Sequence, residues 1–382
     1  MKIPFSIPYV GEEEKLEVLD AINSNWLSKG PKTIQFEKMF SKYVDSPFSI
    51  GLNSCTAGLH LACLALGIGE GDEVIVTPYT FVSTVNTIIH CGAIPVFVDI
   101  DFQTMNIDVP LIEKAITNKT KAVIPVHFAG YPCEMDLLLD IADRHGLKII
   151  EDAAHAVYTQ YKGKMIGSLG DITCFSFYAT KNLATGEGGM LTTQNEEIAD
   201  RIRVMSLHGM SRNAWNRYGD QGSWFYEVHE AGFKYNMTDI QAAFGIAQLK
   251  KLEHMQTLRK KCADLYNKAF TECEELILPH DSLEHRHAWH LYVIRLREEM
   301  LTIDRNEFIQ KLTEVGIGTS VHFIPVPQHP YYQKLGYDLS DYPQTQKAFE
   351  STISLPFYPG LSESQIHYVT DHVIDIISKY KI

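Results

Sequence analysis

Lys181 is the residue whose type and position most clearly suggest covalent chemistry. It follows an apolar stretch that ends in Ser176-Phe177-Tyr178, and it precedes the glycine-rich segment at residues 186–189. A lysine at the end of a buried strand is desolvated, which lowers its pKa and frees the amine to form a Schiff base. The glycines let the backbone turn tightly beside a ligand. A single lysine in this position is more often a solvated surface residue, so the interpretation needs a second observation.

Asp152 supplies that second observation. It ends the apolar segment 147–152 and is followed by Ala153, Ala154 and His155. A carboxylate at the carboxyl end of a strand, followed by small residues, can reach into a ligand cleft. Pyridoxal phosphate (PLP) requires an acidic partner for its ring nitrogen, because the protonated ring is the electron sink. Asp is also favoured as a helix N-cap, but together with Lys181 it indicates a PLP site.

A candidate phosphate site lies near the N-terminus. Residues 53–58 follow the apolar stretch 48–52 and open an apolar helix. The first backbone N–H groups of a helix, here those of Thr56 and Ala57, attract an anion together with the positive end of the helix dipole. An ordinary Ser/Thr cap is the alternative. The glycines at 67, 69 and 71 resemble a dinucleotide fingerprint, but they lie after a helix and before a strand, an order that indicates a turn.

Two further residue types could take part in a site. Phe81 follows the predicted strand 73–77 and can stack on an aromatic cofactor, although a core position is an equal alternative. The 16 histidines contain no HxxxH or HExxH pattern, so we expect no metal site. His285, His287 and His290 fit more simply at the start of a strand.

The elements that must position these residues indicate an α/β fold. Short apolar, β-branched runs alternate with helical patterns such as 109–117 and 134–145, which is typical of a mostly parallel sheet covered by helices on both faces. Ligands of such sheets bind at the carboxyl ends of the strands. The predicted strands are residues 73–77, 95–99, 121–128, 147–152, 171–178 and 189–193.

The length of 382 residues predicts two domains. We expect a large α/β domain over residues 1–250 and a smaller C-terminal α+β domain over residues 251–382. The helical pattern at 239–273 crosses the boundary, so a helix rather than a flexible tether would join the two. In the smaller domain we expect strands at 290–296 and 319–323, a helix at 305–315 and a closing helix from Ser362.

Composition excludes several classes of protein. The net charge of −13 argues against a general nucleic-acid binder and means that a local positive site must hold any anionic ligand. No segment approaches the roughly 20 apolar residues of a membrane span, and residues 1–5 do not resemble a signal peptide. The 7 scattered cysteines argue against structural zinc or a disulfide scaffold, so we expect a cytoplasmic protein.

Taken together, these motifs resemble the PLP-dependent nucleotide-sugar aminotransferases of the DegT/DnrJ/EryC1/StrS family, which have the aspartate-aminotransferase-like fold type I. The resemblance covers nearly the whole chain. It is carried by residues 25–31, 53–58, 151–156, 176–189, 232–239, 316–323 and 354–356.

The resemblance implies a role for each residue that matches a family motif. Lys181 would bind PLP as a Schiff base, and Asp152 would pair with the pyridine nitrogen. Ser176 would hold the cofactor phosphate together with the backbone N–H groups of Thr56 and Ala57.

Three more residues match family positions around the cofactor. Phe81 would stack on the pyridine ring, and His155 would lie near the ring hydroxyl. Asn236 matches an asparagine that reaches the phosphate from the neighbouring subunit, which implies a homodimer with shared active sites.

The resemblance also implies the reaction. An amino group would pass from L-glutamate to a keto sugar, with Trp26, Arg212, Lys234 and His322 as candidate substrate contacts. His155 stands where many relatives have Gln. With residues 287–290 and 321–323, it resembles the subgroup acting on UDP-linked 4-keto sugars, especially the enzyme that makes 4-amino-4-deoxy-L-arabinose. Amination at C3, a sugar dehydratase that retains lysine, and a non-catalytic regulator of the same fold remain alternatives.

Overall fold

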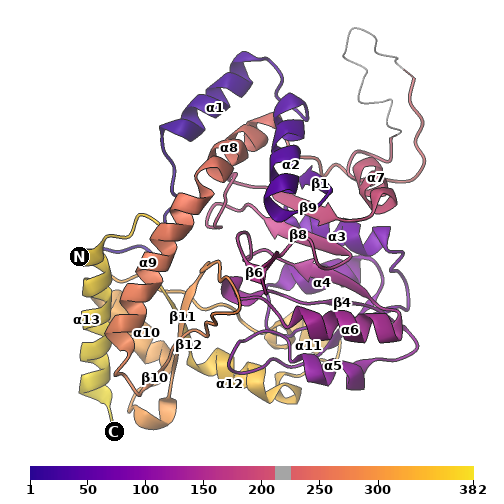
Figure 1. The fold of residues 1–382 in the computed structure, drawn as a ribbon. Coiled ribbons are helices and arrows are strands. Elements are labelled where there is room, and N and C mark those ends of the chain that lie inside the picture. The colour runs from indigo at the N-terminus through magenta and orange to yellow at the C-terminus, as the bar shows by residue number, and fades with distance from the viewer. Residues whose placement is uncertain (211–224) are drawn as a thin grey trace.

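The structure, a computed structural model, describes residues 1–210 and 225–382. A central sheet lies between two layers of helices, and a smaller unit built from the C-terminal third packs beside it (Figure 1). The predicted α/β class is thereby confirmed. Arg212, a predicted substrate contact, lies outside the described residues.

The central sheet has seven strands in the order β1-β9-β8-β5-β4-β2-β3. Only β9 is antiparallel to its neighbours, so the other six strands point the same way and end at one edge. The strands are β1 (Phe48–Leu52), β2 (Glu73–Val76), β3 (Ile94–Phe97), β4 (Thr120–Ile124), β5 (Lys148–Asp152), β8 (Ile172–Ser176) and β9 (Gly189–Thr193).

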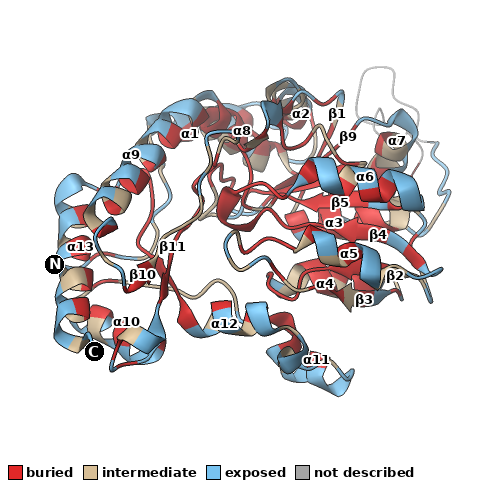
Figure 2. Ribbon diagram, turned by 60° about the horizontal axis from the view of Figure 1, so that its bottom comes forward, coloured by how far each residue is buried: buried red, intermediate tan, exposed pale blue. Residues whose placement is uncertain are grey.

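Helices cover both faces of this sheet because its strands are apolar on both sides. In β4, Val123 packs into one core while Ala122 and Ile124 pack into the other, as the two-residue period of a strand requires. Figure 2 shows the strands buried between the helical layers. One layer contains α2 (Pro31–Val44), α5 (Val109–Ala115), α6 (Met135–His145) and α8 (Asp239–Lys250). The other contains α3 (Cys55–Ala65), α4 (Val82–His90) and α7 (Glu196–Met205).

The C-terminal unit is built on a three-stranded antiparallel sheet in the order β10-β11-β12. Its core joins this sheet to α9, α10 and α13. The elements are α9 (Leu252–Phe270), β10 (Leu276–Ile277), β11 (Tyr292–Leu296), α10 (Arg305–Glu314), α11 (Pro330–Lys334), α12 (Pro343–Ser351), β12 (Thr352–Leu355) and α13 (Glu363–Tyr380).

A break at Lys251 separates α8 from α9. The two helices follow one another across the molecule (Figure 1), α8 against α1 and α2, and α9 against α13. The division into domains at residue 250 stays a prediction. The remaining elements are α1 (Glu12–Asn23), the hairpin of β6 (Gln160–Tyr161) and β7 (Lys164–Met165), and the 3-10 helices η1 (Phe128–Gly130), η3 (Glu298–Met300), η4 (Val326–Gln328) and η5 (Leu339–Asp341).

The strand predicted at residues 319–323 is wrong. Ser320 pairs with Ser354 in an isolated bridge, and the chain then leaves the sheet. The reason is that His322 and Phe323, which are consecutive, both line the same cavity. A strand would send their side chains to opposite faces.

Across the described residues, no helix combines the length and the apolar character that crossing a membrane requires.

Candidate active site

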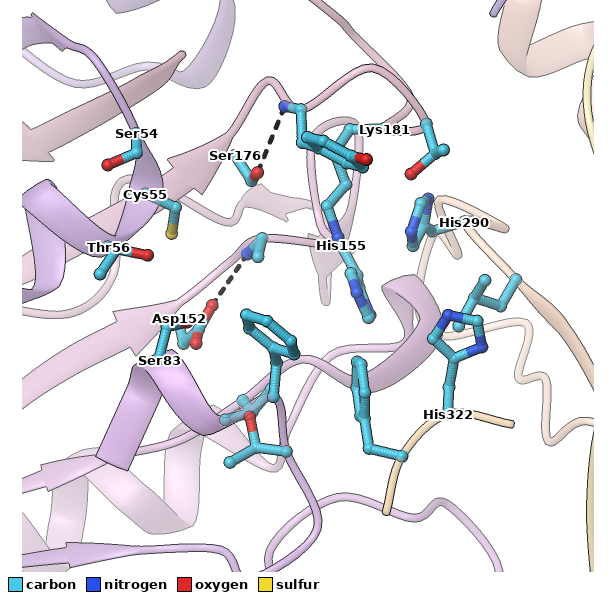
Figure 3. A pocket seen from close by; sticks show the side chains of 18 of the residues that line it. Ser54, Cys55, Thr56, Ser83, Asp152, His155, Ser176, Lys181, His290 and His322 are labelled. Atoms are coloured by element: carbon cyan, nitrogen blue, oxygen red, sulfur yellow. Dashed lines mark hydrogen bonds between the residues drawn. The ribbon is translucent and has the colours of Figure 1, made fainter. Parts of the chain in front are cut away.

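A cavity of about 490 Å³ opens where the parallel strands end. The segments that follow β1, β2, β4, β5 and β8 supply one wall, and residues 290–291, 322–323 and Phe357 close it from the C-terminal unit. Figure 3 shows the side chains around it. Seven residues that the sequence predicted line this cavity: Thr56, Phe81, Asp152, His155, Ser176, Lys181 and His322.

Lys181 reaches the cavity from the loop after β8. Its backbone N–H donates to Tyr178 O at 2.9 Å, which closes a turn and directs the side chain inward. Burial lowers the pKa of Lys181 to about 8, although the charge of Asp152 opposes this effect. A substantial fraction of the amine is therefore neutral near physiological pH, the form that attacks a carbonyl.

Asp152 is held rigidly at the carboxyl end of β5. Its Oδ1 accepts from the N–H of Ala154 at 3.1 Å, and its Oδ2 accepts from Thr84 Oγ1 at 2.7 Å. Thr84 Oγ1 in turn lies 2.9 Å from Thr80 Oγ1. Burial raises the pKa of Asp152, whereas the two hydrogen bonds and the charge of Lys181 lower it. The carboxylate is thus fixed in orientation and faces the same cavity as the amine.

The start of α3 forms an anion cradle. Ser54 caps the helix by accepting a hydrogen bond from Ala57 N–H at 3.1 Å. The N–H of Ala57, which the sequence predicts as a phosphate contact, is therefore already bonded to Ser54. The N–H groups of Cys55 and Thr56 have no hydrogen-bond partner among the described residues. Gly189 lies against this turn, because a Cβ there would be 2.5 Å from the carbonyl carbon of Ser54.

Ser176 and Phe81 flank this cradle. Ser176 ends β8 beside the turn, and its Oγ accepts from Tyr178 N–H at 3.4 Å. Phe81 precedes α4, is 58% exposed and lines the cavity. The core alternative for Phe81 is therefore wrong, because the strand before it ends at the open edge of the sheet.

His155 presents one defined nitrogen to the cavity. Its Nδ1 accepts from the backbone N–H of Ala129 at 3.3 Å, so the proton of a neutral ring lies on Nε2. Burial and the charge of Lys181 lower the pKa of His155 well below its usual value. His155 is therefore a neutral hydrogen-bond donor. His322 is fixed through Nδ1, 2.9 Å from Ser354 Oγ.

The other predicted contacts do not line this cavity. Asn236 pairs with Leu52 beside β1, and its buried Oδ1 has no hydrogen-bond partner among the described residues. Trp26 donates its indole N–H to Lys29 O at 2.9 Å, and Lys234 is exposed on the surface. Ala57 does not line the cavity either, because the lining residues at the start of α3 end at Thr56.

The sequence interpretation missed Thr84, Asn182 and His290. Thr84 holds Asp152, and Asn182 holds His290, which lines the cavity. No spacing pattern indicates Thr84. For Asn182, its position next to Lys181 was the available signal. The strand expected to start at His290 begins two residues later, at Tyr292.

This set of groups fits PLP. The cavity brings together a partly deprotonated lysine for the aldehyde, a fixed carboxylate for the ring nitrogen, free N–H groups for the phosphate and an exposed aromatic ring for stacking. Such a sheet with such a site defines a PLP-dependent transferase.

Comparison with known proteins agrees with this class. The family model for the DegT/DnrJ/EryC1/StrS aminotransferase family matches residues 8–374. The chain belongs to this family and is a PLP-dependent sugar aminotransferase.

Individual relatives match over almost their full length. The spore coat polysaccharide biosynthesis protein SpsC of Bacillus subtilis (strain 168) is 56% identical over 377 residues, which cover 98% of this chain and 97% of that protein. The PLP form of Spr1654 from Streptococcus pneumoniae, provisionally assigned as a sugar aminotransferase, has a TM-score of 0.93 at 36% identity and covers 99% of both chains. PseC of Helicobacter pylori, an aminotransferase involved in the biosynthesis of pseudoaminic acid, has a TM-score of 0.92 at 27% identity, over 99% of this chain and 100% of that chain.

Proposed function

We propose that the protein transfers the amino group of L-glutamate to the C4 keto group of a UDP-linked sugar. The cavity lined by both the Lys181 amine and the Asp152 carboxylate is the observation that carries the proposal. The resemblance of His155 and of residues 287–290 to enzymes acting on UDP-linked 4-keto sugars supports the choice of substrate. The similarity to SpsC supports a role in making sugars for cell-surface polysaccharides.

Lys181 has two tasks in this reaction. Its Nζ would hold the cofactor covalently between turnovers, which requires the neutral amine that burial favours. Once displaced by the amino donor, Nζ would take a proton from the donor carbon that bears the amino group, acting as general base, and would then donate it to the carbonyl carbon of the cofactor, acting as general acid. Its pKa of about 8 suits both directions, because the two protonation states are close in free energy near neutral pH.

Asp152 and the cradle orient the cofactor. PLP, when bound, supplies an electron sink whose strength depends on a protonated ring nitrogen. Asp152, with its Oδ atoms fixed by Thr84 and Ala154, would keep that proton in place. The N–H groups of Cys55 and Thr56, with Ser176, would bind the phosphate, while the Nε2–H of His155 would donate to the ring oxygen.

No observation favours the C3 alternative. The dehydratase alternative is weakened by the chain having Lys181, because sister branches that dehydrate sugars can have His at this position.

We further propose a homodimer in which Asn236 completes the partner's site. Asn236 matches the family asparagine that reaches the phosphate from the neighbouring subunit, and it does not line the cavity of its own chain. Exposed apolar side chains on α1, α2 and α8 would be covered by the second copy. They are Leu16, Leu19 and Ile22 on α1, Ile34 on α2 and Ile240 on α8.

A cytoplasmic location completes the proposal. All seven cysteines are free thiols, as expected in a reducing compartment.

The test offers UDP-, dTDP- and GDP-linked 4-keto sugars, and one 3-keto sugar, to the holoenzyme with ¹⁵N-labelled glutamate. We expect the label at C4 of the UDP-linked sugar. A Lys181→Ala variant controls for transfer that does not depend on the enzyme. Label appearing only in the 3-keto product, or only with another nucleotide, would overturn the proposed substrate.

A further inference from the structure

His290 is held in one orientation by the residue that follows Lys181. Asn182 Oδ1 lies 3.0 Å from His290 Nδ1. The orientation of the Asn182 amide is unambiguous, because its Nδ2 donates to the carbonyl of Ala288 at 2.6 Å and a carbonyl can only accept. Oδ1 therefore faces the imidazole as an acceptor, and His290 Nδ1 must carry the proton.

The backbone around His290 is equally fixed. Its N–H donates to Ala129 O at 2.8 Å, and the N–H of Ala288 donates to Gly130 O at 3.0 Å. The buried side chain of Arg259 reaches the carbonyl of His290 at 3.3 Å. The backbone that carries the imidazole is thus tied to the large unit on one side and to α9 on the other, while Asn182 holds the ring itself.

These contacts define what the other ring nitrogen can do. Burial lowers the pKa of His290 well below its usual value, and the charge of Lys181 acts in the same direction. A neutral ring with its proton on Nδ1 leaves Nε2 as a bare acceptor. Nε2 has no hydrogen-bond partner within residues 1–210 and 225–382, and His290 lines the cavity.

The adjacent imidazole has the opposite character. The ring centroids of His155 and His290 are 4.3 Å apart. His155 offers an Nε2–H donor, whereas His290 offers an Nε2 lone pair. A donor suits the ring oxygen of the cofactor, which is an acceptor. A lone pair requires a ligand group that donates.

We propose that His290 Nε2 accepts a hydrogen bond from a hydroxyl group of the sugar substrate and so orients the keto carbon toward Lys181. This inference rests on the proposed function, because it needs a sugar in the cavity. A hydroxyl is the neutral donor that a sugar supplies. L-glutamate has none, since its carboxylates only accept and its amino group is the reacting group. His290 therefore acts in the sugar half of the reaction and not in the donor half.

The test separates the two half-reactions of the holoenzyme by stopped-flow absorbance. Glutamate bleaches the Schiff-base absorption, and the keto sugar restores it. We expect His290→Phe to slow the sugar half-reaction by about 10- to 100-fold, the range set by one lost hydrogen bond in a desolvated site. The donor half-reaction should stay within about twofold. Asn182→Ala removes the acceptor that keeps the proton on His290 Nδ1, so it should give a smaller loss in the same half-reaction.

His287→Phe is the matched control. His287 lies in the same segment and is equally buried, but its Nδ1 accepts from Trp289 N–H and it does not line the cavity. The His287→Phe variant should leave the rates of both half-reactions unchanged. Equal losses in both half-reactions of His290→Phe and Asn182→Ala, or a loss confined to the donor half, would overturn the proposal. Failure of the native enzyme to restore its absorption with any keto sugar would instead refute the proposed function, since the donor half alone would remain.

Discussion

Thr84 Oγ1 donates a 2.7 Å hydrogen bond to Asp152 Oδ2, from the first turn of α4 to the end of β5. Both side chains are buried, so solvent does not compete for this contact. The hydroxyl therefore stabilises the charged form of the carboxylate on which the electron sink depends.

Thr84→Val should weaken Asp152 as an anion. Loss of the donor removes one of the interactions that lower the pKa of this carboxyl, so the pKa rises and the acidic limb of kcat/KM moves to higher pH. Turnover near neutral pH should fall by about 10-fold. Thr87→Val is the control, because Thr87 is equally buried but donates to Thr84 O at 3.0 Å. An equal shift of the acidic limb of kcat/KM in Thr84→Val and Thr87→Val would contradict the role of Thr84 as the donor to Asp152.

Asp152→Asn should separate cofactor binding from catalysis. The amide retains the shape of the side chain but cannot hold a proton on a ring nitrogen, so kcat should fall by about 10²- to 10⁴-fold while the Schiff-base absorption remains. Glu151→Gln is the neighbouring control. Glu151 accepts from Thr173 and Gly170 away from the cavity, so this change should lower Tm with little effect on kcat. Near-normal turnover of Asp152→Asn would exclude its role.

Uptake of PLP by the apoenzyme should report the pKa of Lys181. The neutral amine is the nucleophile, so the rate should rise with pH and level off above about 8, not near the value of about 10.4 for an exposed lysine. Asp152→Asn should lower this midpoint, because the carboxylate charge favours the ammonium form. Absorbance after rapid mixing measures the rate. A midpoint close to 10 would show that the amine is solvated.

Gly189→Ala should damage the anion cradle. Its Cβ would lie 2.5 Å from the carbonyl carbon of Ser54 and 2.6 Å from Cys55 N, and this backbone cannot yield without moving the start of α3. We expect a loss of about 1–3 kcal/mol in the free energy of unfolding. The Kd for PLP, measured by titration, should rise at least tenfold. Gly360→Ala, whose Cβ would meet nothing nearer than 3.9 Å, should alter neither quantity.

Mixed dimers should test whether Asn236 serves the partner. A Lys181→Ala chain and an Asn236→Ala chain are each expected to be inactive or weak alone. If the sites are shared, a mixed dimer contains one site with both native residues, and mixing should recover up to half of the native activity per dimer. Recovery would fail if Asn236 acted within its own subunit, because both sites would then be damaged.

The sequence by itself determined the parallel sheet and the residues at the ends of its strands. Asp152, Ser176 and Lys181 could be predicted because the carboxyl ends of parallel strands meet at one edge, so position along each strand places the side chain. The apolar periods of helices and strands identified most elements, because each period depends only on residues that are close together in the chain. Thr56 and Phe81 followed from the same rule.

Only the tertiary structure determined which distant side chains complete the site. Thr84 reaches Asp152, and His290 reaches the cavity, from segments whose local pattern predicts a helix or a strand and nothing more. The segment at residues 319–323 has the composition of a strand, yet its end turns into the cavity, where His322 O accepts from Tyr79 OH at 2.7 Å. Such contacts join residues far apart in the chain, so their geometry depends on how whole layers pack. No local spacing encodes that packing.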